Sequence, residues 1–151
     1  MEFIKEVKSL TERRNYMELL LLADEQESMI EKYMDRGEMF VLCEGEKVKA
    51  VCIVTEEEPD ILEIKNLAVS AIYQRKGCGK RMIAFLIKRY QGKYRILQVG
   101  TGESPLTVPF YEKCGFRRSH KIKDFFTKYY DHPIYEGGVQ LKDMIYLQIE
   151  L

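Results

Sequence analysis

The sequence has no excess of charge of either sign and no long apolar run. Its 24 basic residues balance 24 acidic residues, so the formal net charge is zero. Nucleic-acid-binding domains usually carry a basic excess, so the composition argues against a nucleic acid partner. The longest apolar run, Met82 to Ile87, is far shorter than the ~20 residues of a membrane-spanning helix. We therefore expect neither a nucleic acid nor a membrane as partner.

The chain also has few residues arranged to bind metals. It has only two histidines, and none of its four cysteines form a C-x-x-C pair, so we expect no metal site. The cysteines lie beside apolar or glycine residues, which favours reduced thiols in a cytoplasmic protein, although spacing alone does not decide whether a disulfide forms. The apolar stretch from Met17 to Ala23 contains Glu18 and is followed by Asp24, unlike a signal peptide.

The overall composition is typical of one globular domain over residues 1–151. Hydrophobic residues make up 46% of the chain and charged residues 32%. The first half predicts a strand, a helix that begins at the capping-box spacing of Ser9 and Glu12, a second helix ended by Gly37, and three strands. The strands are expected at 2–7, 39–43, 48–55 and 61–69, and the second helix at 25–36. A hairpin turn is expected at 44–46 and an acidic turn at 56–60.

The strand at 61–69 contains an irregularity. Leu62 and Ile64 are apolar on one parity, whereas beyond Asn66 the apolar residues Leu67 and Val69 lie on the other parity. Such a change within a strand indicates a β-bulge.

The second half predicts a strand–helix–strand unit followed by a short helix and two last strands. The helix covers 78–90 and the next strand covers 94–99, which is followed directly by a flexible segment at 100–102. The last two strands cover 116–122 and 144–151. The strands at 61–69 and 94–99 should be parallel and joined with right-handed crossover. Proline inside a helix costs ~3 kcal/mol, so Pro109 predicts that the short helix, which ends at Gly115, either begins late, near Thr107, or is kinked.

The loop before the 78–90 helix is a candidate anion site. Its residues are Gln74, Arg75, Lys76, Gly77, Cys78, Gly79 and Lys80. The first amides of a helix have no internal partner, and the helix dipole adds positive potential there. The loop is neither a Walker A motif nor a dinucleotide fingerprint, because Gln74 and Met82 occupy positions that require glycine. The alternative is an ordinary turn with solvated lysines.

This loop resembles the Q/R-x-x-G-x-G/A acyl-CoA motif of the GNAT N-acetyltransferase superfamily, with Gln74, Gly77 and Gly79 at the motif positions. The segment 110–116 looks like the family's F-Y-x-K-x-G-F segment, and 66–69 ends the preceding strand as the family's bulged strand does. The resemblance covers essentially the whole chain. It implies an α/β (α+β) fold with a mixed six- to seven-stranded sheet, splayed parallel central strands and about four helices.

The resemblance also implies site residues for acetyl-CoA. The helix-start amides of Arg75 to Lys80 would bind the pyrophosphate, Gln74 would also bind the cofactor, and the backbone of Leu67, Ala68 and Val69 would pair with the pantetheine arm. Ser104 stands in for an asparagine that the family often has. Because phosphate must approach bare backbone, we expect Gly79→Val to weaken CoA binding while leaving the fold intact.

Two catalytic residues follow from the same resemblance. Tyr111 would be the general acid for the leaving thiolate and would also contact the cofactor; its alternative is a core tyrosine beside Phe110 and Phe116. Glu63 would be the base that deprotonates the amine; its alternatives are a solvated carboxylate or a partner for Lys65.

The acceptor is not identified by the sequence. The connection before the last strand is rich in aromatic and acidic residues: Phe125, Phe126, Tyr129, Tyr130, Tyr135, Asp124, Asp131 and Glu136. Such a mixture can form a pocket for a cationic amine, the core of a hairpin or a homodimer contact. His120 and His132 are expected on a strand surface and in a loop. We predict a cytoplasmic N-acetyltransferase that transfers an acetyl group from acetyl-CoA to a primary amine; the alternative is a non-catalytic acyl-CoA-binding regulatory module.

Overall fold

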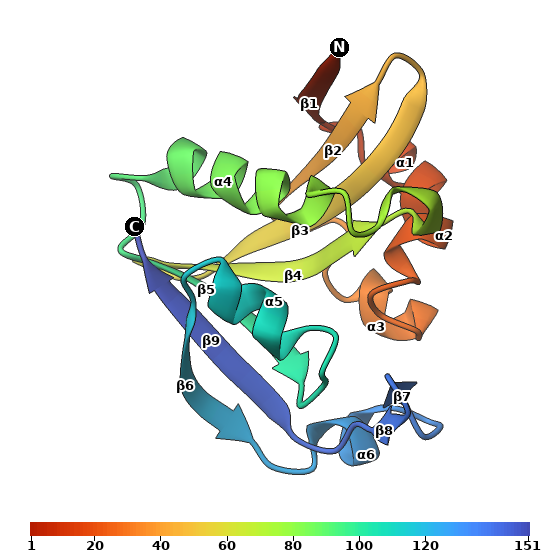
Figure 1. Ribbon diagram of the computed structural model, residues 1–151, viewed down its shortest axis with the longest axis vertical. Helices are drawn as coiled ribbons and strands as arrows, with labels where there is room; N and C mark the ends of the chain where they lie inside the picture. Colours follow the sequence, from red (N-terminus) through yellow and green to blue (C-terminus); the bar gives the residue numbers. More distant parts are fainter.

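A seven-stranded mixed sheet forms the centre of the computed structural model, which describes residues 1–151 (Figure 1). The strand order is β1-β2-β3-β4-β5-β9-β6, and only β4 and β5 run parallel to each other. The strands are β1 (Glu2–Glu6), β2 (Glu38–Glu44), β3 (Lys47–Glu58), β4 (Ile61–Val69), β5 (Ile96–Gly102), β6 (Arg117–Ile122) and β9 (Met144–Glu150). A separate hairpin consists of β7 (Tyr135–Glu136) and β8 (Val139–Gln140).

The helices are shorter and more numerous than the sequence suggests. They are α1 (Leu10–Arg13), α2 (Met17–Leu20), α3 (Glu27–Glu31), α4 (Cys78–Tyr90), α5 (Val108–Lys113) and α6 (Phe125–Tyr129). Ser9 caps α1 as predicted, because its Oγ accepts from the Glu12 amide at 3.2 Å. The predicted second helix at 25–36 is reduced to α3. None of the helices combines the length and hydropathy needed to cross a membrane.

A buried arginine holds these short N-terminal segments together. The Arg13 guanidinium donates to the carbonyls of Val7, Met34 and Gly37 at 3.1, 3.0 and 3.0 Å. Only short segments separated by turns bring three such distant carbonyls to one side chain. The two helices predicted in this part of the chain are therefore present only as short helices separated by turns.

Helices cover both faces of the sheet. The larger core lies between the sheet and α4 with α5, and it includes Met82, Leu86 and Val108. The smaller core lies between the opposite face and α2 with α3, and it includes Leu20 and Ile30. Near the start of β9, α6 and the β7–β8 hairpin lie below α3 in Figure 1. The face of the sheet covered by α2 and α3 is called the second face. The segment with α6 helps to enclose it, because Tyr130 after α6 contacts Asp24 before α3.

The bulge predicted in β4 is present. Ile53 pairs with Asn66 and Val54 pairs with Ile64, which leaves Lys65 as the extra residue. Ile64 and Leu67 consequently both pack in the core beneath α4, whereas Ala68 belongs to the core beneath α2. The bulge thus changes which parity of β4 faces each side of the sheet.

The parallel strands β4 and β5 separate as predicted. Their pairing runs from Ile61 with Ile96 to Ile64 with Val99 and stops there, although β4 continues to Val69. Residues 100–102, predicted to be flexible, instead continue β5 and pair with β9. Gly100 permits this pairing, because a Cβ there would lie 2.8 Å from the Met144 sulfur and 3.1 Å from the Tyr146 ring. The largest other differences in strand boundaries are that β3 extends through Glu58 and that β5 begins at Ile96.

Candidate active site

The N-terminus of α4 is suited to bind an anion. The N-cap Gly77 has φ 84°, and its neighbour Arg75 has φ 62°, so the loop turns sharply into the helix. The amides of the first helical turn have no partner inside the helix, and no acidic side chain lies in that turn. Arg75, Lys76 and Lys80 are exposed and form no ion pair, so their charges add to the helix dipole.

Two other side chains of this region support the loop. Gln74 donates its Nε2 hydrogen to the carbonyl of Val69 at 3.1 Å, which ties the loop to the end of β4. Arg81 pairs with Glu2 through two contacts of 2.5 and 2.9 Å and also donates to the Lys76 carbonyl at 3.0 Å. The Arg81 charge is therefore already compensated.

Gly79 has a packing role that the sequence did not indicate, and its role at the phosphate remains a prediction. The residue is buried, and a Cβ there would lie 2.9 Å from the Phe110 ring of α5. Glycine at this position lets α4 and α5 pack closely. The expectation that Gly79→Val leaves the fold intact is corrected accordingly, although the Gly79 amide remains in the first turn of α4.

The far half of β4 offers an open backbone edge. Leu67, Ala68 and Val69 pair with β3 on one side. On the other side β5 has already diverged, so this edge has no strand partner. An extended ligand with amide groups can pair with such an edge as an added strand does.

Tyr111 is buried on α5 with a free hydroxyl. The helix begins at Val108 after Thr107, as Pro109 predicted. The Tyr111 side chain is 6% exposed and lies edge-on to Phe110 and Phe116, with ring centroids 5.0 and 5.5 Å away. Its hydroxyl has no hydrogen-bond partner within the protein. Burial is the main cause that raises the pKa of Tyr111 well above its usual value, so the phenol stays protonated and is available as a hydrogen-bond donor.

Glu63 is buried in β4 between two donors. Its Oε1 accepts from Gln98 Nε2 at 2.6 Å, and its Oε2 lies 2.9 Å from Lys65 Nζ. The predicted partnership with Lys65 is therefore present. The bulge places Glu63 on the face away from α4, the same face as Asn66 and Ala68, and so separates it from the parity of Leu67.

Ser104 lies just before α5 and its hydroxyl is already in use. It is 3% exposed, and its Oγ accepts from the Leu106 amide at 3.0 Å. Ser104 therefore supports the turn before α5. Burial is the main cause that raises the pKa of the Glu136 carboxyl in β7.

A buried polar network on the second face was missed by sequence reasoning. Tyr33 and Tyr130 donate their hydroxyls to the two oxygens of Asp24 at 2.9 and 2.8 Å. Asn66 donates to the Tyr33 hydroxyl and to the Leu20 carbonyl, both at 3.0 Å. Tyr130 lies 106 positions from Asp24, so no local spacing could have indicated this contact.

The aromatic segment has several roles. Phe126 forms a small core with Ile134 and Leu141, whereas Tyr129 and Tyr135 are exposed. His120 is exposed and stacks on Tyr146 with centroids 4.6 Å apart. His132 is exposed beside Asp131, in the loop where it was expected.

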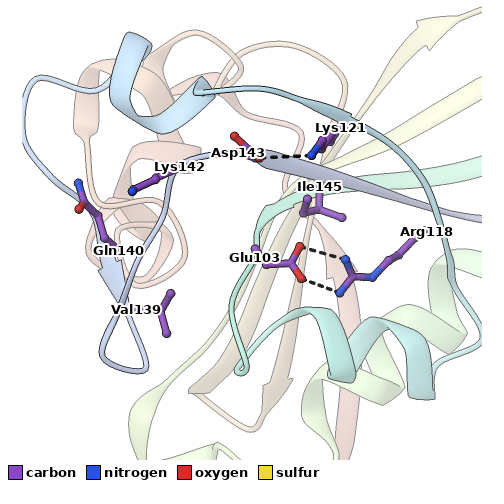
Figure 2. Close-up of a pocket in the computed structure, with 8 residues that line it drawn as sticks. All are labelled: Glu103, Arg118, Lys121, Val139, Gln140, Lys142, Asp143 and Ile145. Carbon is purple, nitrogen blue, oxygen red and sulfur yellow. Dashed lines mark hydrogen bonds and ion pairs between the residues drawn. The ribbon is translucent and has the colours of Figure 1, made fainter.

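A pocket of about 490 Å³ is lined by residues of β6, β8 and the start of β9 (Figure 2). Its lining consists of Glu103, Arg118, Lys121, Val139, Gln140, Lys142, Asp143 and Ile145. Glu103 forms two bonds to Arg118 at 2.8 and 3.0 Å, and Asp143 lies 3.7 Å from Lys121. None of the predicted site residues line this pocket, and both of its carboxylates have basic partners. The structure contains no group of three His, Cys, Asp or Glu side chains able to hold a metal ion.

Comparison with known proteins defines the class of this chain. Residues 35–118 match the family model described as "Acetyltransferase (GNAT) domain". The chain is 35% identical over 136 residues to the "Uncharacterized N-acetyltransferase YvbK" of Bacillus subtilis strain 168, covering 89% of this chain and 88% of that protein. The chain therefore belongs to the GNAT family of acetyltransferases, and it is an acyltransferase.

Solved structures agree over the full length. The "IAA acetyltransferase from Bacillus cereus ATCC 14579" has a TM-score of 0.90 with 35% identity and covers 100% of both chains. A GNAT acetyltransferase from Elizabethkingia anophelis "with acetyl-CoA bound" has a TM-score of 0.91 with 32% identity, covering 99% of this chain and 98% of that one. A Bacillus subtilis acetyltransferase "in complex with CoA" has a TM-score of 0.89 with 31% identity, covering 100% and 99%.

Proposed function

We propose that this enzyme transfers the acetyl group of acetyl-CoA to a primary amine by direct attack. One observation carries the proposal: β4 separates from β5 after Ile64, beside the free helix start of α4. A cosubstrate with a pyrophosphate and a long amide-containing arm fits these two features together. The similar structures that hold acetyl-CoA or CoA support the same assignment.

The geometry of α4 and β4 supports the residues that we propose to hold acetyl-CoA. The amides of the loop from Gly77 to Lys80 bind the pyrophosphate, and Arg75, Lys76 and Lys80 add positive charge. The backbone of Leu67, Ala68 and Val69 binds the pantetheine arm along the open edge of β4. Gln74 positions the end of that edge through the Val69 carbonyl. A contact from Ser104 to the arm remains a prediction, because its hydroxyl already accepts from the Leu106 amide.

The chemical step needs a neutral amine and a stabilised leaving group. Bound acetyl-CoA supplies a thioester whose carbonyl carbon the amine attacks. An alkylamine with a pKa of ~10.4 is charged at neutral pH, so it must lose a proton before it attacks. Glu63 is the base of the proposal, and it acts on the face away from α4. Tyr111 donates a hydrogen bond to the departing sulfur, because its raised pKa keeps the phenol protonated.

The experiment is a screen of primary amines with acetyl-CoA in which free thiol is measured, alongside calorimetric titration with acetyl-CoA. We expect acetyl-CoA to bind and thiol release to depend on added amine, with a reaction lacking amine as the control. Binding without release on any amine would favour a regulatory acyl-CoA-binding module. Absence of acetyl-CoA binding would overturn the proposed function. We also propose a cytoplasmic location, in keeping with four cysteines that form no disulfide.

A further inference from the structure

Three polar side chains form a row across the second face of the sheet. Glu63 of β4 pairs in register with Gln98 of β5, and Gln98 pairs in register with Gln148 of β9. The Gln98 amide donates from Nε2 to Glu63 Oε1 at 2.6 Å. Gln148 in turn donates from Nε2 to Gln98 Oε1 at 3.2 Å. A directed chain of hydrogen bonds therefore runs from β9 through β5 to the proposed base.

Strand packing alone gives no reason for polar groups in this row. Glu63 and Gln98 are both buried, and a buried polar group costs free energy unless it is hydrogen-bonded. Apolar side chains join the same two strands one position earlier, where Leu62 pairs with Leu97. The amide of Gln98 is satisfied at both of its ends, by a carboxylate and by a second amide. This arrangement points to a role in holding the carboxylate.

Gln148 sets the direction of the chain. A carboxylate can only accept hydrogen bonds, whereas a glutamine side chain can present either its NH2 group or its oxygen. Gln98 can serve Glu63 only when its NH2 group is turned toward the carboxylate. Gln148 favours that orientation, because it donates to the oxygen at the other end of the Gln98 amide. Without a donor at position 148, the Gln98 amide loses the contact that distinguishes its two orientations.

The contact between Gln98 and Glu63 lies where β4 and β5 separate. The last pair along these strands is Ile64 with Val99, and both of those side chains face the core beneath α4. On the second face, the pair of Glu63 and Gln98 is therefore the last one before the strands diverge. Beyond it begins the open edge of β4 to which the proposed function assigns the pantetheine arm. Gln98 thus fixes the carboxylate at the start of that opening, while Lys65 holds its other oxygen.

We propose that Gln98 and Gln148 are positioning residues of the acetyl transfer, in which Gln148 orients the Gln98 amide and Gln98 orients the Glu63 carboxylate. This inference rests on the proposed function, since it concerns the base of that reaction. Neither glutamine exchanges a proton or contacts the reacting atoms. Each acts through its neighbour in the row, so the loss of either should change how Glu63 titrates.

The first test is a pH titration by carbon-13 NMR of protein labelled at its glutamate carboxyl groups, which needs no acceptor. The Glu63 signal is identified by its absence in Glu63→Gln. Loss of a donor to a carboxylate favours its protonated form, so Gln98→Leu should raise the pH of half-titration by about one unit. Gln148→Leu should raise it by less. Gln140→Leu makes the same change in β8, outside the row, and is the matched control that should leave the titration unchanged.

A reversal of the chain tests the role of Gln148. In Gln148→Glu the side chain can only accept, so Gln98 should turn its NH2 group toward position 148 and away from Glu63. The pH of half-titration should then rise about as far as in Gln98→Leu. Adding Gln148→Glu to Gln98→Leu should have little further effect, because the intermediate amide is gone. An equal rise in both backgrounds would show that the new charge acts on Glu63 directly, and would overturn the role of Gln148.

Kinetics on an amine found in the acceptor screen separate this inference from the proposed function. Gln98→Leu should lower kcat about tenfold, leave KM for acetyl-CoA nearly unchanged and move the ascending limb of the pH–rate profile to higher pH. An unchanged Glu63 titration in folded Gln98→Leu would overturn the inference while acetyl transfer stands. A shifted titration with an unmoved limb would show that the row holds a carboxylate that is not the base, and would overturn both assignments. If Gln98→Leu does not fold, the Gln148 variants, which change a half-buried side chain, decide the same question.

Discussion

The carboxylate of Glu63 lies 2.9 Å from the ammonium of Lys65, two residues along the same strand. Lys65 is the extra residue of the bulge, so the irregularity in β4 also supplies the partner of the proposed base. With Gln98 donating to its other oxygen at 2.6 Å, Glu63 is held in one orientation. A carboxylate held in this way can act as a base only through an oxygen lone pair that its two donors leave free.

Replacement of Glu63 by glutamine tests whether it acts as the base. If Glu63 accepts the amine's proton, Glu63→Gln removes the ascending acid limb of the pH–rate profile, apart from any limb due to the amine itself. The measurement is kcat/KM for one amine across acidic to neutral pH. Lys65→Met is the companion variant, which removes the ion pair but keeps the Glu63 carboxylate. The pH–rate profile of this variant should therefore keep its ascending limb. A limb that persists unchanged in Glu63→Gln would leave Glu63 with a structural role.

Removal of the Tyr111 hydroxyl should affect turnover and leave binding nearly intact. Tyr111→Phe should lower kcat by ~10²–10⁴, the usual range for loss of a general acid. Acetyl-CoA affinity should change little, because the hydroxyl acts mainly in the transition state. The ring packing against Phe110 and Phe116 is retained in this variant. Wild-type kcat on the true acceptor would remove Tyr111 from the mechanism.

The first turn of α4 should contribute to CoA affinity through charge. Lys80→Ala should weaken CoA binding about tenfold, because it removes an unpaired cation beside the pyrophosphate site. Lys88→Ala is the matched control, since Lys88 is also exposed on α4 but lies in its last turn. Calorimetry at two salt concentrations checks the difference. Equal losses in both variants would contradict an anion site at the helix start.

Gly79 should behave as a packing residue of the fold. Gly79→Val places a side chain against Phe110, and overpacking of this kind typically costs about 1–3 kcal/mol. Thermal or urea unfolding should therefore show a loss of stability as well as weaker CoA binding. In the double variant with Phe110→Ala, the loss should be smaller than the sum of the single losses. Additive losses would argue against the contact as the cause.

Asp24 should make the stability of the protein depend on pH. Burial raises its folded-state pKa above the ~3.9 of an unfolded chain, so the folded state binds this proton more tightly. Its contribution is therefore favourable below the unfolded pKa and is lost as pH rises through the folded pKa. The unfolding free energy of Asp24→Asn, relative to wild type, should increase with pH across that window.

Urea unfolding from about pH 4 to pH 8 measures this difference directly. Glu18→Gln is the control, because Glu18 is exposed on α2 and has no ion-pair partner. Its difference from wild type should stay nearly constant with pH. A difference for Asp24→Asn that decreases as pH rises would show that the carboxylate is stabilised in the folded state, and that Asp24 is already compensated.

The sequence determined the features that depend on neighbouring residues. The change of parity around Asn66 indicated the bulge, and the spacing of Gln74, Gly77 and Gly79 indicated the loop before α4. The short helix with Tyr111 was likewise predicted, together with its late start. These features are readable because strand and helix periods fix which side chains share a face within a few positions.

Only the tertiary structure decided which distant groups meet. It placed Gly79 against Phe110, Arg13 among three carbonyls, and Tyr130 on Asp24. It also left Asn66 Oδ1 and Glu136 Oε2 without partners, which no pattern in the sequence reveals. Such contacts are set by the packing of whole elements across the sheet, and packing brings together residues whose separation along the chain carries no periodic signal.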